Sequence, residues 1–264
     1  MSEPILISQE EAIATVVLNR PESYNAFDRP TIQALADGLA RAATDEQVKA
    51  VIITGSGKAF CAGGNLKAVL AAPEGARAAF HALAPVFHLA ITEIRRTPKP
   101  VIAAINGAAA GGGFSLALAA DFRVMARSAT LRCAYTAAGL CPDGGCTFTL
   151  PRLVGAAEAL AIIALDTPIS AAQALEWGLV TRVADDNKVL DEAKALARDL
   201  LGRSLHAFGW TKRLLQDAYG NSLEQQLELE RQGIAACGGH PDGVEGLTAF
   251  VEKRTPRFRP LDKR

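Results

Sequence analysis

The chain has 264 residues, which is enough for one large domain or two small ones. Its 28 basic and 28 acidic residues balance, so no net field favours nucleic acid or an anionic membrane surface as a partner. The five cysteines lack C-x-x-C spacing and no secretory leader precedes Ile5, so we expect a reducing, cytoplasmic location. Four histidines without an H-E-x-x-H pattern offer little for a metal site, and we expect none.

The N-terminal part of the chain alternates strand and helix signals. A strand is predicted over 13–18, with a turn over 19–23. Asp28 is a suitable N-cap for a helix with Pro30 in its first turn. The apolar face of this helix is expected to hold Ile32, Leu35, Ala36, Leu39 and Ala43.

Two glycine segments carry most of the chemical information. A β-branched strand over 50–54 precedes the first segment, 58–66, and a strand over 101–105 leads into the second, 104–113. Each segment then opens a stretch with helical spacing. Glycine at a helix start lets a ligand approach backbone N–H groups that have no intrahelical partner, and the helix dipole attracts negative charge there. Two such ends aimed at one oxygen would form an oxyanion hole, which indicates an enolate or tetrahedral oxyanion on a carbonyl.

The middle of the chain contains an uncharged stretch of membrane-spanning length. Residues 100–120 carry no charge, but Asn106 and several glycines interrupt them, so we expect a buried strand, turn and helix. Before this stretch, a loop is predicted at 73–75 and a long helix over 78–94. Two short strands are predicted after it, over 122–125 and 130–133.

Beyond residue 151 the pattern becomes helical. Ser170 is expected to cap a short helix that ends at Gly178, followed by one strand near 179–183. Further helices are predicted over 188–201, 206–219, 222–237 and after 241. This order predicts an α/β core over 1–185 and a helical region over 186–264.

Six segments in this order resemble the crotonase (enoyl-CoA hydratase/isomerase) superfamily. They are 18–26, the two glycine segments, 141–145, 169–180 and 249–256. The resemblance implies a spiral of ββα turns with a helical C-terminal trimerisation region, and a homotrimer or homohexamer. It also implies an acyl-CoA thioester as substrate, with no cofactor besides the coenzyme A that the substrate carries.

The resemblance places the chemistry on three main positions. The two oxyanion donors fall on Gly64 and Gly112. The positions of the two hydratase glutamates are taken by Ser115 and Tyr135, neither of which is a carboxylate. Asp143 remains as the acid/base carboxylate, and a single carboxylate suffices to move a proton from C2 to C4 of an enoyl thioester. We therefore expect a double-bond isomerase, with a pattern similar to the isomerases of bacterial phenylacetate breakdown.

Other readings stay open at this point. His88 and Asp143 match the helper histidine and nucleophilic aspartate of the superfamily's aroyl-CoA dehalogenases, although Tyr135 stands where those have tryptophan. The chain is alternatively an enoyl-CoA hydratase-like lyase, an acyl-CoA hydrolase or dehalogenase, or a non-catalytic binding homologue. Ser115 and Tyr135 are alternatively pocket-lining residues, and His88 a packed core residue.

The resemblance also predicts contacts to coenzyme A. They fall on the backbone near residues 25–27 and 62–64, on Lys67 close to the nucleotide, and in the C-terminal tail, where the adjacent subunit sometimes supplies them. The expected residues are Asn25, Ala26, Ala62, Gly63, Asn65, Leu66, Lys67, Phe250 and Lys253.

Overall fold

The computed structural model describes residues 3–258. A six-stranded sheet forms its centre, in the order β1-β2-β3-β5-β7-β10. The edge pair β1·β2 is antiparallel and every other pair in this sheet is parallel. The strands are β1 (Ile5–Glu10), β2 (Ile13–Leu18), β3 (Ala50–Gly55), β5 (Val101–Ile105), β7 (Phe122–Ala126) and β10 (Arg182–Ala184). Strands β3 and β5 are buried along their whole length, as expected for central parallel strands rich in β-branched residues.

A second, smaller sheet alternates with the first along the chain. Its order is β4-β6-β8-β9, with β4 (Ala59–Cys61), β6 (Ala108–Ala110), β8 (Thr130–Arg132) and β9 (Ile169–Ser170). Each of β3, β5 and β7 is followed by one of these short strands. The chain therefore repeats a pair of strands, one in each sheet. The first two pairs lead into helices: α2 (Leu66–Leu70) and α3 (Gly75–Arg96), then α4 (Gly112–Ala119).

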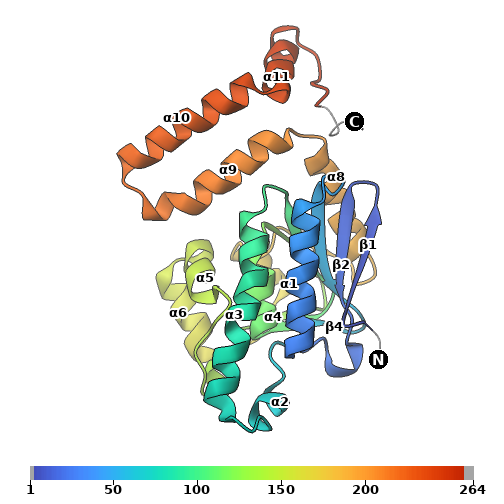
Figure 1. The fold of residues 1–264 in the computed structure, drawn as a ribbon, viewed down its shortest axis with the longest axis vertical. Helices are drawn as coiled ribbons and strands as arrows, with labels where there is room; N and C mark the ends of the chain where they lie inside the picture. Colours follow the sequence, from blue (N-terminus) through green and yellow to red (C-terminus); the bar gives the residue numbers. More distant parts are fainter. Residues whose placement is uncertain (1–2, 259–264) are drawn as a thin grey trace.

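Helices cover the sheets. Helix α1 (Arg29–Thr44) lies beside α3 (Figure 1) and contacts β1 and β2. Asp28 caps α1, as predicted, by accepting a hydrogen bond from the Thr31 N–H. The remaining helices of this part are α5 (Cys146–Val154), α6 (Ala156–Leu165) and α7 (Ala171–Glu176). Ser170 and Gln173 form the capping box of α7.

The last three helices form an arm that reaches away from the sheets, whereas the helix before them covers a sheet. Helix α8 (Val189–Leu201) packs on β3, β5 and β7. Beyond it, α9 (Leu205–Asp217) and α10 (Leu223–Gly239) run side by side and α11 (Pro241–Val251) lies at their end (Figure 1). The division of the chain at residue 185 stays a prediction, but α8 lies beyond that point and still covers the sheet.

Several elements differ from the sequence-based expectation. Strand β1 was not predicted, because only Ile5 of its six residues is buried and no alternation is visible. Strand β6 lies inside the second glycine segment, where a direct passage from strand to helix was expected; three residues are too few to give a periodic signal. On α1, Ala42 is buried and Ala43 is only half-buried. The expected strand and helix within 100–120 are confirmed as β5 and α4, and the short strand β6 lies between them where a turn was expected.

Candidate active site

The N-terminus of α4 is shaped by glycine. Gly111 adopts φ 54° and ψ −125°, a conformation that only glycine adopts without strain. A Cβ at Gly113 would lie 2.1 Å from the Cys61 carbonyl oxygen, so the helix packs directly on the backbone of β4. This geometry leaves the first N–H groups of a fully buried helix at the end of the small sheet.

The first glycine segment lies against this helix end. A Cβ at Gly63 would lie 2.9 Å from the Gly112 nitrogen. The segment is held by Phe27, whose N–H donates to the Gly63 carbonyl (2.7 Å) and whose carbonyl accepts from the Asn65 N–H (2.8 Å). Within residues 3–258, no acceptor bonds the N–H of Gly64 or of Gly112. Gly64 faces open space, since a Cβ there would meet no atom within 4 Å.

These contacts bring the two predicted oxyanion donors onto neighbouring stretches of backbone. Both segments follow adjacent parallel strands, β3 and β5, and so emerge at the same edge of the sheet. The convergence of the Gly64 and Gly112 N–H groups on one thioester oxygen stays a prediction.

One turn into α4, Ser115 joins a cluster of two hydroxyls and a carboxylate. The Ser115 Oγ lies 2.9 Å from the Tyr135 hydroxyl and 2.9 Å from the Asp143 carbonyl oxygen. The Tyr135 hydroxyl donates to Asp143 Oδ1 at 2.7 Å. Ser115 is 1% exposed and Tyr135 8%, whereas the Asp143 side chain is 38% exposed. The three residues proposed from the sequence therefore form one unit, with the carboxylate at its accessible end.

Burial and the neighbouring negative charge of Asp143 raise the pKa of Tyr135 well above that of a free phenol. The phenol therefore stays protonated at neutral pH and serves as a donor. Its position depends on the preceding residue, because Ala134 adopts φ 56° and its N–H donates to Asp166 Oδ1 at 2.5 Å. Asp166 is 5% exposed, and no motif in the sequence indicated this supporting contact.

His88 borders the same cluster. Its Nε2 lies 4.0 Å from Asp143 Oδ2 and accepts a hydrogen bond from the Gly144 N–H at 3.3 Å. An accepting Nε2 carries no proton, which puts the imidazole proton on Nδ1. The side chain is 51% exposed, so it is not the packed core residue that was one interpretation of the sequence.

Two aromatic rings connect the glycine segments to the carboxylate loop. The Phe27 and Phe87 rings lie 5.2 Å apart between centroids. A Cβ at Gly112 would lie 3.3 Å from the Phe27 ring, and one at Gly144 would lie 2.3 Å from the Phe87 ring. Sequence reasoning did not include Phe87, which looked like an ordinary apolar position on a helix.

The residues proposed to contact coenzyme A fall into two groups. Ala62, Leu66 and Lys67 are exposed beside the open space at Gly64. The other polar candidates have structural tasks: Asn25 is fully buried and its amide donates to the Ala59 and Phe60 carbonyls, while Asn65 caps α2. Ala26 is half-buried and precedes Phe27, so only backbone in this stretch remains for a ligand.

Phe250 and Lys253 lie far from this site in their own chain. They belong to α11 and the residues after it, at the opposite end of the molecule from α2 (Figure 1). Phe250 is 83% exposed. A contact from either residue to coenzyme A would therefore have to be made to a neighbouring subunit.

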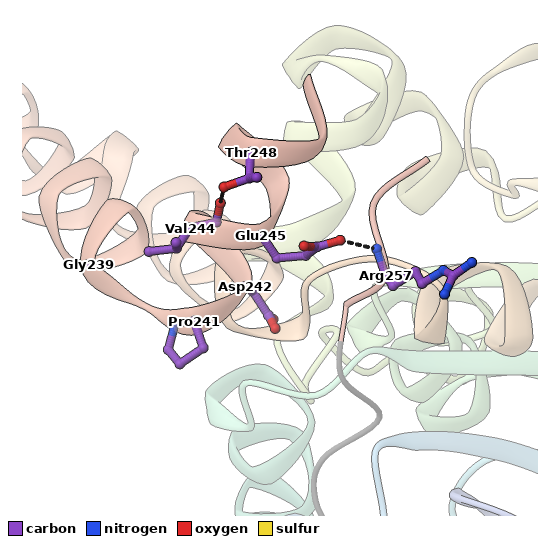
Figure 2. A pocket seen from close by; sticks show the side chains of 7 residues that line it. All are labelled: Gly239, Pro241, Asp242, Val244, Glu245, Thr248 and Arg257. Carbon is purple, nitrogen blue, oxygen red and sulfur yellow. Dashed lines mark hydrogen bonds between the residues drawn. The ribbon is translucent and has the colours of Figure 1, made fainter. Parts of the chain in front are cut away.

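A pocket beside α11 is separate from this site. Figure 2 shows Glu245 accepting a hydrogen bond from the Arg257 N–H across it. None of its lining residues belongs to the glycine segments or to the cluster at Asp143. Within residues 3–258, no three His, Cys, Asp or Glu side chains gather as metal ligands. No helix in the described part of the chain has both the length and the apolar character to cross a bilayer.

Comparison with known proteins agrees with this fold. The chain is 38% identical to a 1,2-epoxyphenylacetyl-CoA isomerase of Escherichia coli K12, over 98% of the chain and 99% of that protein. It is 32% identical to a 4-chlorobenzoyl coenzyme A dehalogenase of an Arthrobacter species, over 94% and 91% of the two chains. The crystal structure of an enoyl-CoA hydratase from Polaromonas sp. JS666 superposes with a TM-score of 0.91 at 39% identity, covering 97% of this chain and 99% of the other.

These relatives confirm the fold expected from the sequence, a crotonase-type core followed by C-terminal helices. The family model of enoyl-CoA hydratase/isomerase matches residues 8–260, and on this evidence the chain belongs to the enoyl-CoA hydratase/isomerase family.

Proposed function

We propose that this protein is an enoyl-CoA isomerase that shifts a double bond through a thioester enolate, with Asp143 as the proton carrier. The observation that carries the proposal is the composition of the cluster around Ser115. Within the described residues, Asp143 is the one carboxylate hydrogen-bonded into it. Water addition by the hydratase route uses two carboxylates, and the two positions concerned hold Ser115 and Tyr135 instead.

The proposed reaction uses Asp143 for both proton transfers and the two backbone N–H groups for the oxyanion. Asp143 takes a proton from C2 of a 3-enoyl thioester, and the electron pair moves onto the thioester oxygen. The N–H groups of Gly64 and Gly112 stabilise that oxyanion, typically by a few kcal/mol for each donor. Asp143 then returns the proton at C4, which leaves the 2-enoyl thioester. No cofactor takes part beyond the coenzyme A of the substrate.

Tyr135 does not replace Asp143 as the base. The raised pKa of its phenol keeps it protonated at neutral pH, and its proton is donated to the carboxylate. This supports Asp143 as the group that exchanges protons with the substrate.

The second candidate is an acyl-CoA dehalogenase or hydrolase, in which Asp143 attacks the substrate and His88 activates water. The distance of 4.0 Å between His88 Nε2 and Asp143 Oδ2 favours it, as does the similarity to the Arthrobacter dehalogenase. Against it, the Nε2 lone pair that a general base needs is used by the Gly144 N–H. We therefore rank it below the isomerase, together with a hydratase-like lyase and a non-catalytic binding homologue.

The remaining features of the proposal concern the whole protein. We place it in the cytoplasm as a homotrimer or homohexamer, acting on a free acyl-CoA thioester rather than on nucleic acid or a membrane. The division of labour follows the predicted boundary, with the acyl-CoA site in 1–185 and assembly through 186–264.

The test is incubation with 3-hexenoyl-CoA in deuterated water, followed by ultraviolet absorbance and mass spectrometry. Isomerisation is expected to produce the conjugated 2-enoyl thioester and to incorporate deuterium, with no other change in mass. Gain of one water by 2-hexenoyl-CoA would identify a hydratase, and chloride release from 4-chlorobenzoyl-CoA would identify a dehalogenase. Binding of these thioesters without any turnover would leave the non-catalytic reading.

A further inference from the structure

The hydrogen bonds of the Asp143 carboxylate are unequal, and this inequality assigns its two oxygens different tasks. Oδ1 accepts the Tyr135 hydroxyl at 2.7 Å. Within residues 3–258, no hydrogen bond reaches Oδ2, and His88 Nε2 lies 4.0 Å from it, beyond hydrogen-bond distance. Since Nε2 already accepts from Gly144, it offers Oδ2 no proton. Oδ2 is thus the oxygen that remains for a substrate proton.

From this arrangement we infer that Tyr135 and Ser115 are positioning residues, which hold Asp143 so that Oδ2 alone takes and returns the proton. The inference rests on the proposed isomerase function and extends it to two residues with no proton to exchange with the substrate. It explains why a buried tyrosine and serine occupy two positions where hydratases of this family have glutamates.

Proton counting supports a fixed direction for this hydrogen-bond chain. The phenol has one proton and two neighbours, Ser115 Oγ at 2.9 Å and Asp143 Oδ1 at 2.7 Å. The carboxylate is the stronger acceptor, so the phenol proton points to Oδ1. The Ser115 proton then goes to the phenol oxygen or to the Asp143 carbonyl, both at 2.9 Å. Either choice ties Ser115 to the aspartate it supports.

The same chain persists when Asp143 carries the proton. A carboxyl group protonated on Oδ2 keeps a carbonyl-type oxygen at Oδ1, which still accepts from Tyr135. The carboxyl group therefore need not rotate between the two proton transfers. A single carboxylate oxygen can serve both C2 and C4 if both carbons of the acyl group lie within its reach on one side of the substrate, or if the acyl group shifts between the two proton transfers.

The cluster is held rigidly enough for this task. Ser115 lies on α4, one turn after Gly112, so the hydroxyl and the proposed oxyanion donor share one buried helix. A Cβ at Gly144 would lie 3.0 Å from the Ser115 Cβ and 2.3 Å from the Phe87 ring. The loop that carries Asp143 is therefore packed against α4 without room for a side chain.

The test compares Tyr135→Phe and Ser115→Ala with wild type, and Tyr219→Phe serves as the matched control. Tyr219 is 70% exposed and lies on the helical arm. The first measurement needs no turnover: the carboxyl ¹³C signal of Asp143 is followed by NMR of protein labelled with ¹³C-aspartate at one neutral pH, with Asp143→Asn assigning the signal. Loss of the hydrogen bond that Tyr135 donates to Oδ1 is expected to shift this signal in Tyr135→Phe.

The second measurement is the pH profile of the 3-hexenoyl-CoA reaction. In Tyr135→Phe, we expect kcat to fall at least about tenfold with KM nearly unchanged, and the acidic limb of kcat to move to higher pH. Ser115→Ala is expected to lower kcat less and to shift the limb little, since the phenol still donates to Oδ1. Tyr219→Phe should match wild type in both measurements.

The outcomes separate this inference from the proposed function. An unchanged Asp143 carboxyl signal in Tyr135→Phe, in a protein that unfolds at the wild-type temperature, overturns the positioning role. A shifted signal in a protein that turns over no enoyl-CoA leaves the contact in place and overturns the isomerase proposal. If kcat of Tyr135→Phe falls as much as expected but its pH profile does not shift, Tyr135 contributes through packing alone.

Discussion

Gly63 and Gly112 touch: a Cβ added to Gly63 would stand 2.9 Å from the Gly112 nitrogen and 2.7 Å from the Ala110 carbonyl oxygen. The two glycine segments are thus in backbone contact, although the residues lie in different strand pairs. Any residue with a side chain at position 63 would also have to adopt a backbone φ of 86°. This contact fixes how the proposed oxyanion donors are spaced.

We expect Gly63→Ala to separate the two segments. The free energy of unfolding should fall by about 2–4 kcal/mol, and kcat/KM should fall about 100-fold, as for the loss of one oxyanion donor. Gly75→Ala is the control for backbone strain alone, because Gly75 has φ 83° and a Cβ there meets no atom within 4 Å. Equal effects of the two changes on kcat/KM would contradict the spacing argument.

Asp143→Asn tests the proton carrier directly. The amide has the same shape and still accepts the Tyr135 hydroxyl, so binding of acyl-CoA, measured by calorimetry, should change by less than about threefold. Deuterium exchange at the substrate α-carbon should disappear. His88→Ala should lower kcat less than about fivefold, since its Nε2 accepts the Gly144 N–H and lies beyond hydrogen-bond distance of Asp143. A covalent adduct on Asp143 that accumulates in His88→Ala would instead support the nucleophilic route.

The sequence could predict that the two glycine segments lie next to each other, for a physical reason. Both segments follow buried strands, and β-branched strands of a parallel sheet end at the same edge. The contact between Gly63 and Gly112 is a direct consequence of β3 and β5 being neighbours. Local patterns also sufficed for Asp28 and Ser170, because a cap is defined within one helical turn.

Other features depend on contacts between distant parts of the chain. Tyr135 follows Ala134, which has a left-handed conformation and donates its N–H to Asp166 Oδ1, a contact that no spacing rule predicts. The backbone around Asn25 is predicted to lie near coenzyme A, and the Asn25 side chain donates to the carbonyls of Ala59 and Phe60, which no motif indicated. A family motif indicates where a residue lies; it does not indicate which of its atoms remain free.

Lys212 is expected to be the main attachment of α9 to the core. Its ammonium is buried and bonds the carboxylate of Asp121 and the Ile94 carbonyl, both at 2.8 Å. Burial lowers the pKa of Lys212 and raises the pKa of Asp121, so burial disfavours the charge of each group. Each charge is stabilised by the opposite charge of its partner. Lys212→Met should lower the free energy of unfolding by about 3–5 kcal/mol in urea titrations, because it leaves a buried charge without its partner.

Arg213→Met is the control for Lys212→Met. Arg213 is the next residue on α9 and its pair with Asp217 is exposed, at 3.9 Å. Its replacement should change stability by less than about 1 kcal/mol. Similar effects at the two positions would show that α9 is held by its apolar contacts instead.

Asp28 should make the stability of α1 depend on pH. Burial acts to raise the pKa of this carboxyl, but hydrogen bonds from Thr31 and the Arg20 guanidinium outweigh burial and lower the pKa below its ordinary value. Its stabilisation is therefore present above the unfolded-state pKa and is lost as the pH falls through the folded-state value. Asp28→Ala should cost about 1–2 kcal/mol at pH 7, and urea titrations should show this difference shrinking below about pH 4.

The comparison for Asp28 is Ser170→Ala, which removes an uncharged cap from α7. Its cost should stay constant over the same pH range. If the effect of Asp28→Ala is equally constant, the carboxylate contributes as a hydrogen-bond acceptor whose ionisation does not matter.

The exposed apolar residues of α10 lead to a prediction about assembly. Leu223, Leu227 and Ile234 are 69%, 53% and 73% exposed, and helices rarely leave such a face in water. We expect light scattering to give the mass of a trimer or hexamer. The double change Leu227→Asp and Ile234→Asp should release monomers, whereas Leu70→Asp, on α2 at 80% exposure, should leave the assembly intact.

Assembly should also decide whether Phe250 serves a site. In its own chain it lies at the far end from α2 (Figure 1), so any contact with coenzyme A must come from the next subunit. Phe250→Ala should then raise KM for 3-hexenoyl-CoA several-fold with kcat nearly unchanged, because the ring would contribute equally to substrate and transition-state binding. In the monomeric α10 double variant, the added change should have no effect on KM. A wild-type protein that is monomeric at micromolar concentration would contradict both the assembly and the shared site.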